Sequence, residues 1–110
     1  MSKQPTATDG EVKWSAWLAE QMQGVAEYWL PCKARVDIVT DTLAIEVDWV
    51  KKWAEAFGQA TYYAAQTDRQ PAVLLLLRGK HTEAKYLARA RITGAKSGIP
   101  VLTWKTHSEA

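Results

Sequence analysis

The sequence predicts an α/β fold in which a mixed β-sheet carries helices on both sides. Segment 43–50 alternates, residue by residue, between the set Leu43, Ile45, Val47 and Trp49 and a more polar set, which is the period of a strand. Segment 72–77 is an unbroken apolar run, typical of a strand covered on both faces. A helical pattern lies between the two segments, and such a strand–helix–strand unit pairs its strands in parallel.

Composition places the chain among small folded proteins. At 110 residues, with 47% hydrophobic residues and six tryptophans, it is expected to form one domain with a modest core. The net charge of +2 is too small to indicate nucleic-acid binding by itself. The single Cys32 excludes an intramolecular disulfide and a cysteine zinc cluster and fits a cytoplasmic location. No apolar run approaches the roughly 20 residues that span a bilayer, so no membrane partner is expected.

Turn formers, prolines and glycines divide the chain into an α-β-β-β-α-β-α-β order. Asp9 and Thr82 are the expected caps of the first and third helices, and Gly94 or Gly98 is expected to end the third. The predicted segments are a flexible tail at 1–10, a helix from 11 to about 24, strands at 25–30, 36–38 and 43–50, a helix at 52–64, a strand at 72–77, a helix from 83, a strand at 99–104 and a flexible tail at 106–110. Residues 11–105 are therefore expected to be a single domain.

Two carboxylates are the first candidate site residues. Asp37 and Glu46 project from strands expected to be hairpin partners, and carboxylates brought together in this way repel each other. A hard divalent cation is the natural partner for such a pair. The alternative is that both side chains belong to the solvated side of an exposed hairpin, because alternation is ordinary in antiparallel sheets.

The helix after the hairpin places polar residues beside its apolar face. At 100° per residue, Lys52, Gln59 and Tyr63 form a stripe next to the face made by Trp53, Phe57, Ala60 and Ala64. Trp49 and Trp53 are expected to pack the hairpin onto this helix. Lys52 can equally be a surface lysine near a helix start. Glu11 is either a first-turn acid that favours the helix dipole, the preferred interpretation, or a carboxylate that reaches over the sheet.

These residues resemble the motifs of the PD-(D/E)xK nuclease superfamily, whose fold many restriction enzymes, Holliday-junction resolvases and RecB- or Cas4-like exonucleases share. Asp37, in segment 34–37, resembles the second-strand aspartate, and Glu46 resembles the acidic member of the third-strand motif. Segment 59–63 is similar to the Gln-x-x-x-Tyr helix motif of the RecB-like branch. The sequence departs from the family at Asp48, which stands where the family usually has its lysine; the resemblance then implies a lysine that has moved to Lys52.

The resemblance implies a restriction-endonuclease-like core and metal-dependent hydrolysis of DNA, with Mg²⁺ or Mn²⁺ as the cofactor. The implied metal ligands are Asp37, Glu46, the Val47 carbonyl and Asp48, and the implied catalytic set is Asp37, Glu46, Lys52, Gln59 and Tyr63, with Glu11 as a further member. Contacts to DNA phosphate are expected from a basic segment made by Lys80, His81, Lys85, Arg89 and Lys96. A homodimer is a further expectation. The alternative function is a nuclease-like domain without catalysis that binds DNA or protein.

Overall fold

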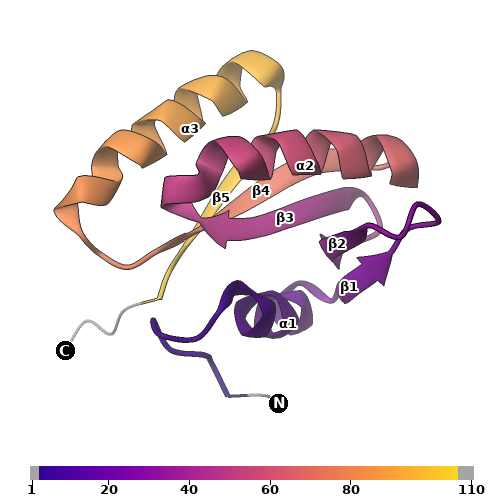
Figure 1. Cartoon of the computed structure of the whole chain (residues 1–110), viewed down its shortest axis with the longest axis horizontal. Coiled ribbons are helices and arrows are strands. Elements are labelled where there is room, and N and C mark those ends of the chain that lie inside the picture. The colour runs from indigo at the N-terminus through magenta and orange to yellow at the C-terminus, as the bar shows by residue number, and fades with distance from the viewer. Residues whose placement is uncertain (1–2, 107–110) are drawn as a thin grey trace.

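The computed structural model describes residues 3–106, and its elements follow the predicted order (Figure 1). Two short 3₁₀-helices, η1 and η2, precede the second and third α-helices. The α/β class with a mixed sheet is confirmed. The elements are α1 (Glu11–Met22), β1 (Val25–Trp29), β2 (Arg35–Val39), β3 (Leu43–Trp49), η1 (Val50–Lys52), α2 (Trp53–Thr67), β4 (Gln70–Leu77), η2 (His81–Glu83), α3 (Ala84–Ser97) and β5 (Val101–Lys105).

The strands of the described residues form one five-stranded sheet in the order β1-β2-β3-β4-β5. β1, β2 and β3 pair antiparallel, whereas β3, β4 and β5 pair in parallel. The β3–β4 ladder runs from Leu43↔Gln70 to Trp49↔Leu76, as the strand–helix–strand pattern predicted. The parallel half needs cover on both faces, and the helices provide it.

Figure 1 shows α1 on one side of the sheet and both α2 and α3 on the other. On the α1 side, Trp14 and Leu18 pack with Ile45 and Val47 of β3. On the α2 side, Phe57 and two small helix residues pack with the apolar side chains of β4 and α3. Residues of β3 alternate between the α1-side core and the opposite face, where Ala44 packs with Ala64 of α2, and this alternation is the structural meaning of their period of two.

The expectation that Trp49 and Trp53 pack the hairpin onto α2 is wrong. Trp49 packs with the core on the α1 side, and the Arg78 guanidinium lies 3.5 Å from the centre of its ring. Trp53 packs with the core on the α2 side, against Phe57. The intervening η1 turn separates the two rings, because the chain leaves the sheet at Val50 to begin the helix.

The face of α2 that meets the sheet is made largely of small residues. Ala60 and Ala64 are buried, as predicted, and Ala56 joins them. Small side chains let a helix axis approach a sheet closely. Gly94 serves the same purpose on α3, because a β-carbon there would lie 2.7 Å from the Ile99 carbonyl oxygen. Gly98, at φ +73°, is the left-handed C-cap that ends α3, one of the two glycines expected there.

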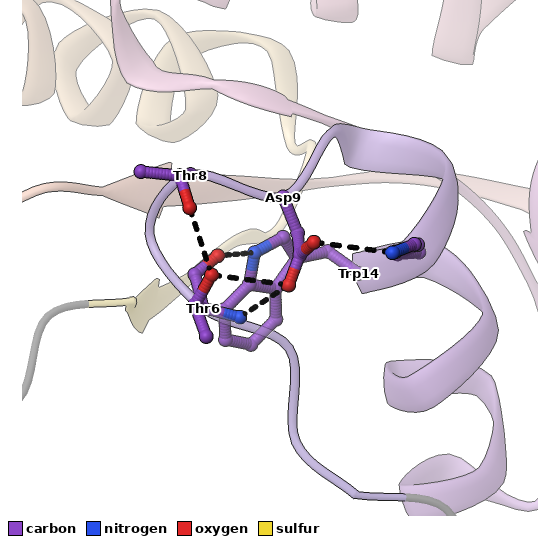
Figure 2. Close-up of polar contacts among 5 residues, drawn as sticks. Thr6, Thr8, Asp9 and Trp14 are labelled. Atoms are coloured by element: carbon purple, nitrogen blue, oxygen red, sulfur yellow. Dashed lines mark hydrogen bonds and ion pairs between the residues drawn. The ribbon is translucent and has the colours of Figure 1, made fainter.

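The segment before α1 folds back onto that helix, and the predicted capping role of Asp9 is wrong. The N-cap is Gly10, and the Asp9 carboxylate instead accepts hydrogen bonds from the Thr6 backbone N–H at 2.7 Å and the Thr6 hydroxyl at 3.1 Å (Figure 2). The indole N–H of the fully buried Trp14 donates to the Thr6 carbonyl at 3.0 Å. The aspartate is drawn into this turn because Asp closes a local turn as readily as it caps a helix.

The expected cap of the third helix is also wrong. Thr82 lies within η2, and the N-cap of α3 is Glu83, which makes no side-chain capping hydrogen bond to that helix. The Glu83 carboxylate instead accepts the backbone N–H groups of Arg78, Gly79 and Lys80 at 2.8–3.1 Å and closes the turn before η2. A carboxylate that accepts several backbone N–H groups binds this turn more strongly than a hydroxyl would.

At the C-terminal end of the described chain, Thr106 is buried and hydrogen-bonds the Leu77 carbonyl through its N–H and its hydroxyl. The rest of the predicted C-terminal tail, 107–110, and residues 1 and 2 of the N-terminal tail lie outside the described residues. Across residues 3–106, no helix has both the length and the apolar character needed to cross a membrane.

Candidate functional site

A polar cavity of about 260 Å³ lies where β2 and β3 meet α1 and α2; we call it the acidic pocket. Every predicted catalytic or metal-binding residue except Lys52 lines it. One residue that the sequence did not single out, Arg35, lines it as well. The full lining is Glu11, Arg35, Asp37, Glu46, Val47, Asp48, Gln59 and Tyr63.

The pocket exists because the β2–β3 ladder stops short. Its paired residues are Ile38↔Ile45 and Val39↔Ala44, so Asp37 and Glu46 come directly after the last pair. The Asp37 carboxylate accepts the Val47 backbone N–H at 2.8 Å. A side chain thus takes up a strand N–H that backbone pairing leaves free, and its acidic group is held at the opening between the two strands.

Glu46 is 5% exposed, so the interpretation of this residue as part of a solvated hairpin face is wrong. Its Oε1 atom has no hydrogen-bond partner among the described residues. Burial, followed by the neighbouring charge of Asp37 and a hydrogen bond with it, raises the pKa of Glu46 to about 9. A buried carboxyl group with a free oxygen is costly unless it stays protonated or meets a cation.

Asp48 adds a third carboxyl group, which is buried at 8% exposure, and Glu11 from α1 meets it. Burial raises the pKa of Asp48 to about 7, with further contributions from the Glu11 charge and a Glu11 hydrogen bond. One Asp48 oxygen accepts the Trp49 backbone N–H at 2.8 Å. Glu11 therefore occupies the first turn of α1 and also reaches the pocket, so the two interpretations of this residue coexist.

α2 supplies the remaining polar wall. Gln59 and Tyr63 lie one helical turn apart, which brings both side chains to the pocket as the helical period predicted. Burial, followed by the charge of Glu46, raises the pKa of the half-buried Tyr63 phenol. The Tyr63 hydroxyl therefore stays a proton donor at neutral pH, and Gln59, which is exposed, offers an amide donor and acceptor.

Lys52 does not share this wall. It is exposed at the end of η1, where it lines a neighbouring depression with Glu11 and Trp49. The expected stripe assumed helical geometry from Lys52 onward, but Lys52 is the N-cap of α2. Its backbone, at φ −100° and ψ 27°, is not helical, so the helical period does not describe its direction. Its ammonium group still opposes the rise in the pKa of Asp48, which places its charge at the rim of the pocket.

Arg35 is the cation that the sequence analysis missed. It begins β2, two residues before Asp37, and forms an ion pair with Glu27 of β1 at 3.3 Å. Burial raises the pKa of Asp37, and the Arg35 charge opposes that rise. The signal was present in the sequence, because residues two apart on a strand share a side.

The predicted DNA-contact residues form a separate surface. Lys80, His81, Lys85, Arg89 and Lys96 are all exposed, and none of the five lines the acidic pocket. Lys85 and Arg89 flank the Tyr86 ring on α3, with cation-to-ring distances of 5.1 and 5.8 Å. A role of this surface in DNA binding stays a prediction.

The residues of the acidic pocket suit a hard divalent cation by their chemistry. Within the described part of the chain, four carboxyl groups and one guanidinium line the pocket, and Glu46 Oε1 is an oxygen without a partner. As the side chains lie, no group of three or more His, Cys, Asp and Glu residues among 3–106 is arranged to hold a metal ion. Asp37 and Asp48 each direct one oxygen to a backbone N–H, and each has a second oxygen for a further ligand contact.

Comparisons with family models, with curated proteins and with solved structures found no match to this chain.

Proposed function

We propose that the protein is a metal-dependent nuclease that hydrolyses phosphodiester bonds in DNA, on a restriction-endonuclease-like core. One observation carries the proposal: Glu46 is buried beside Asp37 and Asp48, has an unpartnered oxygen, and has a pKa raised to about 9. Folding brings three carboxyl groups together at a stability cost, which a divalent cation would offset. Clusters of this kind, with perturbed pKa values in a polar pocket, are typical of functional sites.

Asp37 and Glu46 would hold the metal, with Asp48 and the Val47 carbonyl as further oxygen ligands. A bound Mg²⁺ or Mn²⁺ supplies positive charge to phosphate oxygens and lowers the pKa of a coordinated water. For the carboxyl groups to act as ligands, Glu46 must release its proton on metal binding. Activity is therefore expected to rise with pH across the neutral range, where Asp48 also ionises.

The other residues of the pocket would position the phosphate and the attacking water. The Gln59 amide and the Tyr63 hydroxyl would donate hydrogen bonds along the α2 edge. The Arg35 guanidinium would contact the non-bridging oxygens of the phosphate next to the one at the carboxyl groups, through two N–H groups at once. Lys52, at the rim, would add positive charge where negative charge develops on the phosphate.

The test is cleavage of plasmid and linear DNA in Mg²⁺ or Mn²⁺, with EDTA as the metal-free arm. Glu46→Gln keeps the shape of the side chain and removes its charge, so cleavage is expected to fall to background. Glu55→Gln is the matched control, because Glu55 is an exposed acid on α2 outside the acidic pocket. Metal-dependent cleavage that survives in Glu46→Gln would refute the proposal.

The position of Lys52 favours a second candidate, a nuclease-like domain that binds DNA without cleaving it. Among the described residues, no lysine lines the acidic pocket, so the ammonium group that the resemblance places beside the attacking water is displaced to the rim. Salt-sensitive DNA binding by the purified protein, with no cleavage under any metal condition, would identify this binding module.

A further inference from the structure

The β1 edge of the sheet exposes two aromatic side chains, and one of them, Trp29, lies next to a residue of the acidic pocket. Trp29 is 63% exposed and Tyr28 is 39% exposed. Tryptophan is rarely left this open to water, because burying its ring is favourable. β1 is an edge strand, so no further strand formed by residues 3–106 flanks these rings.

Arg35 connects Trp29 to the pocket. The two residues are partners in the β1–β2 ladder, and the Arg35 guanidinium lies 5.7 Å from the centre of the Trp29 ring. The same guanidinium forms the 3.3 Å ion pair with Glu27, and the Arg35 side chain lines the acidic pocket. Five N–H donors are available on a guanidinium, so the Glu27 contact leaves donors for a phosphate.

We infer that the β1–β2 hairpin binds single-stranded DNA, with one base stacked on Trp29 and the adjoining phosphate on Arg35. The inference rests on the proposed function, whose substrate it narrows to a strand with unpaired bases. A flat exposed indole beside a cation is the combination that binds single strands, because an unpaired base presents its face for stacking. Bases within a duplex are already stacked and cannot lie on a side chain in this way.

The spacing along the hairpin directs the strand into the pocket. Two residues along a strand advance about 7 Å, which separates Arg35 from Asp37. This distance is close to one extended nucleotide, so a phosphate on Arg35 places its neighbour at the carboxyl groups. The stacked base on Trp29 therefore sets which phosphodiester reaches Asp37.

The geometry of β1 opposes pairing of this edge with a second copy of the chain. Glu27 has φ +54°, a left-handed conformation in the middle of the strand, and carries a charge. Kinks and charges on an edge strand prevent edge-to-edge pairing. The exposed Trp29 ring and the Arg35 guanidinium are thus left for a ligand with flat apolar faces and anionic links.

The test measures binding apart from cleavage. A fluorescein-labelled oligothymidylate of about 12 nucleotides is titrated in EDTA, and its anisotropy is compared with that of a blunt duplex. Trp29→Ala is expected to weaken single-strand binding roughly 5- to 150-fold, equivalent to ~1–3 kcal/mol of base stacking. Trp29→Phe is expected to retain part of this affinity. Trp104→Ala is the matched control, because Trp104 is a partly exposed tryptophan on the opposite edge strand. The Trp104→Ala variant is expected to bind the single strand with wild-type affinity.

Two further variants test the phosphate contact. Arg35→Gln is expected to lower the slope of log affinity against log salt concentration by about 0.7, the value for one lost phosphate contact on a single strand. Glu27→Gln is expected to tighten binding, because it releases the Arg35 guanidinium from its ion pair.

Three results would each overturn the inference. Trp29→Ala could bind the single strand with wild-type affinity, it could lose duplex binding as strongly as single-strand binding, or the wild-type protein could fail to bind the single strand. Failure of the nuclease proposal gives a different result. In that case single-strand binding remains sensitive to Trp29, and no cleavage occurs with Mn²⁺.

Discussion

Replacing Glu46 by glutamine is expected to stabilise the metal-free protein and to flatten its dependence on pH. In the folded protein the pKa of Glu46 is raised to about 9 from an ordinary value of 4.5. Below about pH 4.5 the carboxyl group is protonated in both folded and unfolded chains, so its contribution to the unfolding free energy is fully present. As the pH rises towards 9, the unfolded chain ionises and the folded chain keeps its proton. Stability from this group is therefore lost progressively across that range.

The expected size follows from the linkage between proton binding and folding. Each pH unit between the two pKa values lowers the unfolding free energy by about 1.4 kcal/mol, so the loss reaches about 3 kcal/mol at about pH 7. Glutamine does not ionise, and Glu46→Gln is expected to recover up to that amount. A smaller slope remains in the variant, because burial also raises the pKa values of Asp37 and Asp48.

Urea unfolding in EDTA at several pH values from about 5 to about 8 measures this directly, since the midpoint and slope give the unfolding free energy. The difference between Glu46→Gln and wild type should grow with pH. Glu55→Gln, on the exposed side of α2, should follow the wild-type curve. Parallel curves for wild type and Glu46→Gln would show that Glu46 is not held protonated by its surroundings, and the account of the pocket would fail.

Two further predictions concern packing and the β2–β3 opening. Gly94→Ala is expected to lower the unfolding free energy by about 1–3 kcal/mol, because its β-carbon would meet the Ile99 carbonyl oxygen at 2.7 Å. Gly58→Ala on α2 is the control. A β-carbon at Gly58 would meet no described atom within 4 Å outside its own helix backbone and chain neighbours, so this variant should be more stable by about 0.5–1 kcal/mol. Equal losses of unfolding free energy for the two variants, measured in urea, would contradict the packing at Gly94. Asp37→Ala is expected to lower the unfolding free energy by about 1–3 kcal/mol at about pH 7, because it leaves the Val47 N–H unpaired. Asp37→Asn keeps an acceptor for this N–H and is expected to lose less. Equal losses in the two variants would argue against the hydrogen bond.

The sequence was sufficient for the elements and for most of the pocket, because both depend on local periods. The alternation along β3 placed Glu46 and Asp48 on one side of the strand, and the helical period placed Gln59 and Tyr63 together. The periodicity of a strand does not predict which other elements cover each of its two faces. The exposed-hairpin alternative for Glu46 was wrong because α1 and α2 close over both faces of β3.

The residues that the sequence misplaced depend on geometry that local patterns do not carry. Lys52 left the expected stripe because it is the N-cap of α2 and its backbone is not helical. Asp9 closes a turn with Thr6 because the buried indole of Trp14 holds that segment against α1. Arg35 was missed although its place two residues before Asp37 puts both residues on one side of β2; its position at the pocket also depends on where the β2–β3 ladder ends.

The most direct test of the acidic pocket is a crystal of the protein soaked in Mn²⁺ near neutral pH, with the ion located by its anomalous scattering. A peak between the Asp37 and Glu46 carboxyl groups is predicted, at oxygen distances of about 2.0–2.2 Å and with Glu46 Oε1 among the ligands. No peak at these residues, with the carboxyl groups of Asp37 and Glu46 still hydrogen-bonded to each other, would contradict the metal site on which the proposed function depends.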